Sequence, residues 1–104
     1  MSKMTVEDLL TKVPEGRLLT MHEELTAAVI PNTCEVHEFV QRVNRMIDKG
    51  DLCINSNNYR HMYTPTVRNL VFKEMARRYA LAVEGRSTEA YDDVEYDRIL
   101  EGEI

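Results

Sequence analysis

A chain of 104 residues is long enough for one domain with a single modest core. Its hydrophobic content of 43% is typical of a globular protein, and no apolar run approaches the ~20 residues that cross a bilayer. The first residues lack the basic and then apolar order of a signal peptide. We therefore expect a cytoplasmic protein without a membrane partner.

The net charge of −5 is unevenly distributed along the chain. Residues 34–78 carry eight basic and five acidic side chains, a balance of +3, whereas residues 79–104 carry two basic and eight acidic ones, a balance of −6. An acidic total argues against a nucleic-acid partner, but a local basic surface is enough to bind one. The middle of the chain is therefore the place where such a surface is expected.

The first third of the chain predicts two short helices. Thr5 can cap the start of the first helix, which has apolar residues at helical spacing and ends before Pro14. Leu18–Leu19 is predicted as a brief strand. Thr20 then begins a capping-box pattern, so the second helix is expected from Met21 to about Val29.

A strongly amphipathic helix is predicted next. Asn32 to Glu35 indicates a helix start, because short polar side chains there accept hydrogen bonds from the first free amides. Lys49 suits the negative end of the helix, and Gly50 allows the left-handed conformation that ends it. The apolar positions recur at three- and four-residue steps and are Val36, Phe39, Val40, Val43, Met46 and Ile47.

A β-hairpin is predicted after this helix. Leu52–Ile54 and Tyr59–Thr64 are rich in residues that favour strands. Between them, Asn55–Asn58 contains residues that tolerate the positive backbone angles of a tight turn. The chain should therefore reverse here as two paired strands around a polar tip.

The last third predicts a long fourth helix and an acidic tail. The helix restarts near Pro65 and runs from Val67 to about Val83. Its apolar side is formed by Leu70, Val71, Met75, Tyr79 and Ala82. Residues 86–104 are expected to be largely disordered, or at most to form a short docking helix around Asp93 to Leu100. The expected organisation is therefore a domain of residues 1–85 followed by the acidic tail 86–104.

The order of these elements resembles that of winged helix-turn-helix proteins. The resemblance is carried by Asp-Lys-Gly-Asp-Leu at residues 48–52, by the Asn/Ser tip, and by Arg-His-x-Tyr-Thr-Pro at residues 60–65. It covers roughly residues 5–66. The resemblance implies a mainly α fold with a small β-hairpin (α+β) and a recognition helix that binds double-stranded DNA. The long helix predicted over Val67 to about Val83 is an addition to that fold.

Within that resemblance, the outer face of the third helix and the wing would hold the DNA-binding residues. In the major groove, Arg side chains bond guanine edges and Gln side chains bond adenine edges. A wing arginine neutralises phosphate or enters the minor groove. The candidate DNA-binding residues are Gln41, Arg42, Arg45, Asn57, Asn58 and Arg60.

A simpler interpretation stays open for both sets of residues. Glu38 can pair with Arg42 four residues on, which would make the outer face of the helix an ordinary solvated surface. Asn57 and Asn58 are also the residue type that a tight turn requires. In a DNA complex, Glu35 and Glu38 would meet phosphate unless one of them accepts a hydrogen bond from cytosine.

A second resemblance lies in the long fourth helix. Asn69–Glu74, read as Asn-Leu-Val-Phe-Lys-Glu and followed by Ala80–Val83, is similar to the C-terminal part of the Ren proteins of lambdoid phages. This resemblance implies a phage origin and a role close to DNA metabolism in the host cytoplasm. The long acidic tail departs from the pattern.

The long fourth helix also bears on oligomeric state. Its apolar side offers more surface than a small domain covers, which favours a homodimer through this helix. The alternative is that the apolar side packs back on its own core.

No enzyme, cofactor or metal site is expected. The chain has no glycine-rich phosphate loop and no nucleophile motif. Cys34 and His37 share a helical face, but no second closely spaced pair completes a zinc site.

The leading interpretation is a phage-type winged-helix DNA-binding protein that acts in transcription regulation or replication. The alternative is a winged-helix module for protein–protein interaction, which binds a host or replication protein.

Overall fold

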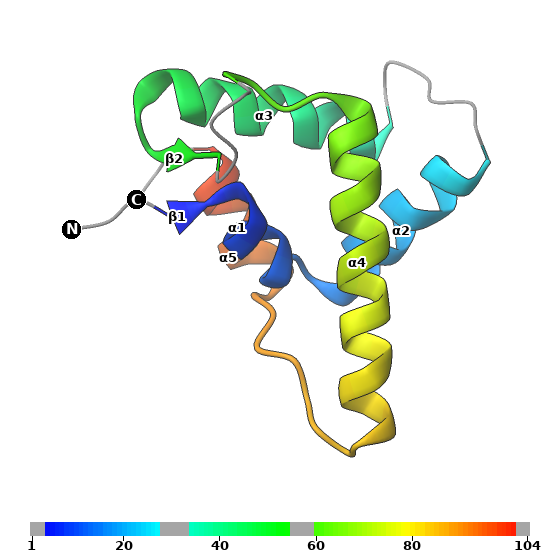
Figure 1. The fold of residues 1–104 in the computed structure, drawn as a ribbon. Helices are drawn as coiled ribbons and strands as arrows, with labels where there is room; N and C mark the ends of the chain where they lie inside the picture. Colours follow the sequence, from blue (N-terminus) through cyan, green and yellow to red (C-terminus); the bar gives the residue numbers. More distant parts are fainter. Residues whose placement is uncertain (1–3, 28–33, 55–59, 102–104) are drawn as a thin grey trace.

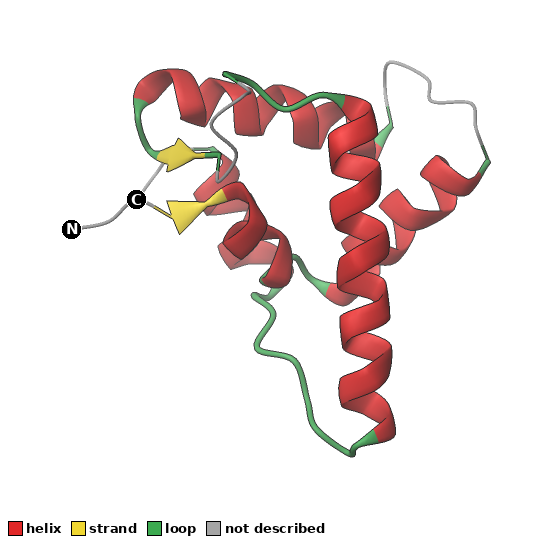
Figure 2. Cartoon of the chain, viewed as in Figure 1, coloured by secondary structure: helices red, strands yellow, loops and turns green. Residues whose placement is uncertain are grey.

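The computed structural model describes residues 4–27, 34–54 and 60–101. These ranges contain five helices and two short strands (Figures 1 and 2). They are β1 (Met4–Thr5), α1 (Val6–Thr11), α2 (Glu15–Thr26), α3 (Glu35–Lys49), β2 (Leu52–Cys53), α4 (Thr64–Val83) and α5 (Asp93–Leu100). The mainly helical α+β class is therefore confirmed. None of these helices is both long enough and apolar enough to cross a membrane.

α1 begins as the sequence predicts. The Thr5 hydroxyl accepts a hydrogen bond from the amide of Asp8 at 3.0 Å, which satisfies one of the free amides of the first turn. Its buried residues are Val6, Leu9 and Leu10. α1 therefore enters the core along one side.

α2 differs from the prediction in its start. The predicted strand at Leu18–Leu19 is wrong, because α2 already begins at Glu15. Leu18, Met21 and Leu25 recur at helical spacing and are all buried, so a single amphipathic helix accommodates the whole segment. The expected end at Val29 lies outside the described residues.

α3 runs from Glu35 to Lys49, as predicted. At its start, the Glu24 carboxylate of α2 accepts hydrogen bonds from the amides of Glu35 at 3.0 Å and Val36 at 2.9 Å. At its end, Gly50 has a φ of 87°, the left-handed conformation expected of it. α2 and α3 are thus joined by a cap that crosses from one helix to the other.

The predicted β-hairpin is wrong in the described part of the chain. β2 forms at Leu52–Cys53, but it pairs in parallel with β1 rather than with the segment that follows it. Arg60–Tyr63, which belongs to the second half of the expected hairpin, lies in no strand. The expected tip Asn55–Asn58 and Tyr59 lie outside the described residues. The wing of a winged helix is therefore not confirmed.

The side chain of Asn44 on α3 explains this difference. Its Nδ2 donates a hydrogen bond to the carbonyl of Met62 at 3.0 Å, and its Oδ1 accepts one from the amide of Met62 at 2.6 Å. The Met62 side chain is buried in the core. Both backbone groups that Met62 would offer to a neighbouring strand are therefore already paired with α3.

Replacing Asn44 with alanine should lower the free energy of unfolding by about 1–3 kcal/mol. The reason is that the amide and carbonyl of Met62 would lose their partners in a partly buried place. Urea denaturation measures the change. Gln41→Ala, at an exposed position of the same helix, is the control and should stay within about 0.5 kcal/mol of the unsubstituted protein. Equal effects of the two substitutions would contradict the prediction.

α4 turns only part of the predicted apolar side to the core, since Val71 is buried and Leu70 and Met75 are partly buried against the core. Apolar spacing places Tyr79 and Ala82 on the core side, yet Tyr79 is 74% exposed and Ala82 is exposed as well. The buried residues of α4 are Val67, Val71, Glu74 and Arg78. Two charged residues thus occupy core positions, which apolar periodicity cannot indicate.

Glu74 and Arg78 form a buried ion pair. Nε of Arg78 donates to the Glu74 carboxylate at 2.7 Å, and Arg77 donates two hydrogen bonds to it at 2.9 and 2.8 Å. Burial alone would raise the pKa of the Glu74 carboxyl. The hydrogen bonds from Arg77 and Arg78 outweigh burial, so this pKa lies below its ordinary value. Glu74 is therefore ionised at neutral pH.

The acidic C-terminal segment is more ordered than predicted. Disorder was the main expectation for residues 86–104, but residues 93–100 form α5. Tyr96, Ile99 and Leu100 of this helix are buried in the same core as the residues of α1, α2 and α3. The alternative expectation, a short docking helix, describes α5 correctly.

Arg17 of α2 links α5 to the rest of the core. Its Nε donates to Glu35 of α3 at 2.6 Å, its Nη1 donates to Asp97 of α5 at 3.0 Å, and its guanidinium lies 5.0 Å from the centre of the Tyr96 ring. Burial lowers the pKa of Arg17, but its hydrogen bonds to the two carboxylates raise this pKa more, so the net shift is upward. The three helices therefore meet at one cation.

Candidate nucleic-acid interface

α3 lies along one edge of the molecule (Figure 1). Its inner residues Val36, Phe39, Val43 and Met46 are buried. Gln41 and Arg45 are exposed on the opposite side, four residues apart and therefore neighbours on the helix surface. These two predicted residues thus share an open face, which we call the outer face of α3.

Arg42 lies on a flank of α3 rather than on its outer face. It is half-buried, α3 packs against α5, and the charge of Arg42 acts on the Tyr96 hydroxyl of α5. Burial is the main cause of the raised pKa of Tyr96, and the positive charges of Arg17 and Arg42 only reduce that rise. Arg42 is therefore less open to a ligand than the outer face.

Arg60 is exposed in a segment that is held beside α3. Nε2 of His61 lies 2.7 Å from the Asp48 carboxylate, and the Asn44 side chain bonds the backbone of the same segment. Both anchors belong to the C-terminal half of α3. Arg60 is therefore held next to that half of the helix.

The charges on and beside the outer face nearly balance. The cations are Arg45, Lys49 and Arg60, and the acids are Glu38 and Asp48. Asp48 is engaged by His61, and Nζ of Lys49 lies 3.6 Å from Asp51. Within the described ranges, neither Arg45 nor Arg60 makes an ion pair. These two guanidinium groups are therefore available to an anionic ligand.

Two residues of this region are not among the DNA-binding residues that the sequence predicts. Lys49 is exposed close to the outer face, and its spacing of four residues from Arg45 could have indicated it. Asn44 has no comparable signal, since a polar residue on the flank of a helix has the same pattern whether it bonds water or a neighbouring segment.

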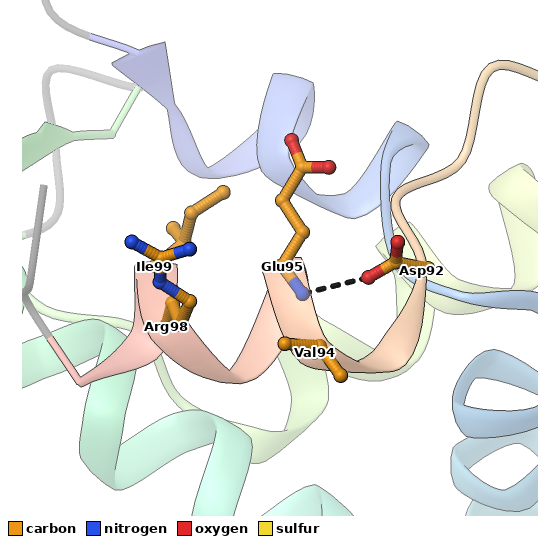
Figure 3. A pocket seen from close by; sticks show the side chains of 5 residues that line it. All are labelled: Asp92, Val94, Glu95, Arg98 and Ile99. Carbon is orange, nitrogen blue, oxygen red and sulfur yellow. Dashed lines mark hydrogen bonds between the residues drawn. The ribbon is translucent and has the colours of Figure 1, made fainter.

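A hollow of about 420 Å³ lies against α5 (Figure 3). It is lined by Asp92, Val94, Glu95, Arg98 and Ile99. The Asp92 carboxylate already accepts a hydrogen bond from the amide of Glu95 at 2.8 Å, as a helix cap does. Because all the lining residues come from one helix and its cap, the hollow lacks the enclosure of a small-molecule site.

A second hollow, of about 290 Å³, lies between α1, α4 and the segment after α4. Three basic side chains line it, and each lies within 3.5 Å of a carboxylate. The pairs are Lys12 with Glu89, Arg77 with Glu74, and Arg86 with Glu84. These pairs leave little uncompensated positive charge for an anion. The outer face of α3 is therefore the better candidate for anion binding.

The structure describes two further predicted groups only in part. Asn57 and Asn58 lie outside the described residues. The Cys34 thiol accepts a hydrogen bond from the amide of His37 at 3.4 Å, and in the described part of the chain no three His, Cys, Asp or Glu side chains are placed to hold a metal ion. Comparisons with models of protein families, with curated proteins and with solved structures gave no match.

Proposed function

We propose that this protein binds double-stranded DNA through the outer face of α3 and the neighbouring Arg60, and acts in transcription regulation or replication. The observation that carries the proposal is the pairing of an exposed Gln41 and Arg45 on a helix whose start is fixed by Glu24 of the preceding helix. Two helices in this order, with the second exposed, suit a helix-turn-helix unit.

Each basic or amide side chain has a distinct role in this proposal. Arg45 bonds the O6 and N7 atoms of guanine in the major groove, and Gln41 bonds the N6 and N7 atoms of adenine. Arg60 neutralises a phosphate beside the groove, and Arg42, on the flank, reaches the backbone of the same strand. Phosphate contacts supply affinity, whereas Arg45 and Gln41 supply the choice of sequence.

The proposal does not require the wing of a winged helix. Arg60 is presented by a segment that Asn44 and Asp48 anchor to α3, and this segment takes the place that a wing would have. A winged-helix relationship and a phage origin remain part of the proposal, on the element order and on the sequence of residues 69–74 respectively.

Fluorescence anisotropy with duplex DNA at several salt concentrations tests this function. Arg45→Gln combined with Arg60→Gln should weaken binding by about tenfold or more and should reduce the salt dependence by about one counterion for each lost phosphate contact. Arg86→Gln removes a charge from an exposed residue that follows α4 in the sequence and should change little, because the C-terminal end of α4 lies far from α3 (Figure 1).

Two results would contradict the proposal. One is an absence of DNA binding at low salt. The other is a loss of binding free energy in the Arg86 variant that equals the loss per removed charge in the double variant, because only net charge, and no particular surface, would then matter.

A protein-interaction module is the second candidate. It is favoured by Glu38 and Asp48, which lie exposed on the same helix as Arg45 and would repel phosphate. A face of mixed charge suits a host or replication protein better than it suits DNA. A purified partner whose binding survives the double substitution Arg42→Gln and Arg45→Gln, in a protein that does not bind DNA, would support this candidate.

A further inference from the structure

Exposed apolar side chains gather between α2 and α4. Leu19 is 45% exposed, Tyr79 74% and Val83 71%. A hollow of about 260 Å³ opens between the two helices, with Leu19, Met75, Tyr79 and Ala82 among its lining residues. We call the surface formed by Leu19, Met75, Tyr79, Ala82 and Val83 the α2/α4 face. A contiguous apolar surface of this kind is typical of a contact with another macromolecule.

α2 and α4 run antiparallel along this face. The ring of His22 lies 5.0 Å from the ring of Phe72, whereas Glu15, at the other end of α2, lines the hollow together with Ala82. In Figure 1 the last turns of α4 extend away from α3. The α2/α4 face is thus a two-helix strip that runs from a Phe72 end to an Ala82 end.

The two ends of this strip carry opposite charges. The guanidinium of Arg68 lies 5.3 Å from the centre of the Phe72 ring, and Glu15 is exposed at the Ala82 end. Within the described ranges neither charge makes an ion pair. Arg68 and Ala82 are separated by about 21 Å along the helix, and Met75 is midway between them. The charges therefore lie at similar distances on either side of the centre.

We propose that a second copy of this chain covers the α2/α4 face, with a twofold axis near Met75 and the two α4 helices antiparallel. This symmetry brings each Arg68 opposite Glu15 of the second copy, while Leu19 and Tyr79 become covered. A twofold interface must be self-complementary, and opposite charges at equal distances from its centre meet that requirement.

Other occupants of the strip fit less well. An unrelated protein partner needs no such symmetry of charge. An anionic membrane would be attracted by Arg68 and repelled by Glu15, so the strip offers it no net positive charge. The dimer does not depend on DNA binding, since the α2/α4 face and the outer face of α3 share no residue.

Sedimentation equilibrium of the full chain tests the dimer. Arg68→Glu should weaken it by about tenfold or more, because two symmetric ion pairs become two repulsive contacts. The double variant Glu15→Arg with Arg68→Glu should restore most of the lost affinity. Lys73→Glu makes the same change of charge at an exposed position of α4 outside the face and should leave the dimer intact.

Tyr79→Ser examines the apolar part of the same contact and should also weaken the dimer by about tenfold. Tyr79 is largely exposed, so its loss should not unfold the chain. A chain that is monomeric at every concentration, a dimer that Arg68→Glu leaves unchanged, or a double variant as weak as the single one would overturn the proposal. Failure of the dimer would leave the proposed function intact, because the two faces share no residue.

Discussion

Replacing Arg78 with methionine should lower the free energy of unfolding by about 3–5 kcal/mol. Arg78 is only 9% exposed, and its Nε donates to the Glu74 carboxylate at 2.7 Å. Methionine fills similar space but removes the charge. Glu74 would then stay buried with only Arg77 as its partner, at a site where an uncompensated carboxylate is costly.

Arg78 also completes the end of α1. Its Nη2 donates to the carbonyls of Val13 at 2.6 Å, Thr11 at 3.2 Å and Leu10 at 3.5 Å. These carbonyls lie at or just beyond the end of α1, where intrahelical donors run out. One guanidinium thus balances a buried carboxylate and satisfies the end of a neighbouring helix. Its Nη1 has no partner in the described part of the chain, which offsets some of this gain.

Urea denaturation measures the effect of Arg78→Met, and two further variants locate its cause. Arg77→Met should cost at most about 1 kcal/mol, because the Arg77 side chain is 45% exposed. If the uncompensated charge of buried Glu74 is the main cause, the double variant Glu74→Met with Arg78→Met should recover much of the lost free energy of unfolding. If the α1 carbonyls dominate, the double variant should stay as unstable as the single one. A loss below about 1 kcal/mol for Arg78→Met would contradict both explanations.

Truncating Tyr96 to alanine should have a comparable effect, about 3–5 kcal/mol. The Tyr96 ring is fully buried, lies beneath Arg17 and holds α5 to the core together with Ile99 and Leu100. Tyr96→Phe should behave in the opposite way. The Tyr96 hydroxyl is buried without a hydrogen-bond partner in the described residues, so its removal should be neutral or should stabilise the protein by up to about 1–3 kcal/mol.

The same residue should make stability depend on pH in alkaline solution. Burial raises the pKa of Tyr96 above its ordinary value of about 10, so above that pH the unfolded chain loses the proton first. The contribution of Tyr96 is therefore complete below about pH 10 and is lost as pH rises toward the folded pKa. Tyr96→Phe removes the ionisable hydroxyl, so the unsubstituted protein should lose more stability than the variant between pH 9 and 11, a window set by the ordinary pKa of about 10.

Denaturation of the two Tyr96 variants thus examines whether α5 is docked. Tyr96→Ala as stable as the unsubstituted protein would mean that α5 is detached in solution and that the acidic segment behaves as the disordered tail that its composition predicts. Tyr96→Phe less stable than the unsubstituted protein would mean that the hydroxyl has a partner.

The parts of the fold that sequence predicts are those with local signals. α3 is marked by its apolar spacing and by Gly50, which both act within a few residues, whereas the Glu24 carboxylate that caps its start belongs to α2. The hairpin prediction is wrong in the described residues because the Asn44 side chain, 18 residues earlier in the sequence, hydrogen-bonds both the amide and the carbonyl of Met62. The buried side of α4 differs in part from the predicted one because Glu74 and Arg78 compensate each other's charge in the core. A prediction from apolar periodicity assumes that each charged residue is exposed.

In α5 and in the candidate interface, too, the sequence predicts the features that have local signals and misses those that depend on distant residues. Tyr96, Ile99 and Leu100 are buried and recur at helical spacing in the sequence. The acidic residues around them favour disorder, and only the folded structure shows that Arg17 compensates the charge of Asp97. Gln41 and Arg45 follow from the periodicity of one helix. The half-burial of Arg42 depends on the docking of α5, which no local pattern indicates.

Amide chemical-shift mapping by NMR tests the DNA-binding face most directly. A duplex is titrated into the labelled protein at low salt, and the shifted amides are placed on the structure. The proposed function predicts shifts concentrated at residues 37–49 of α3 and residues 60–63, which weaken together as salt is added. No shifts at low salt, or shifts confined to the α2/α4 face, would contradict it.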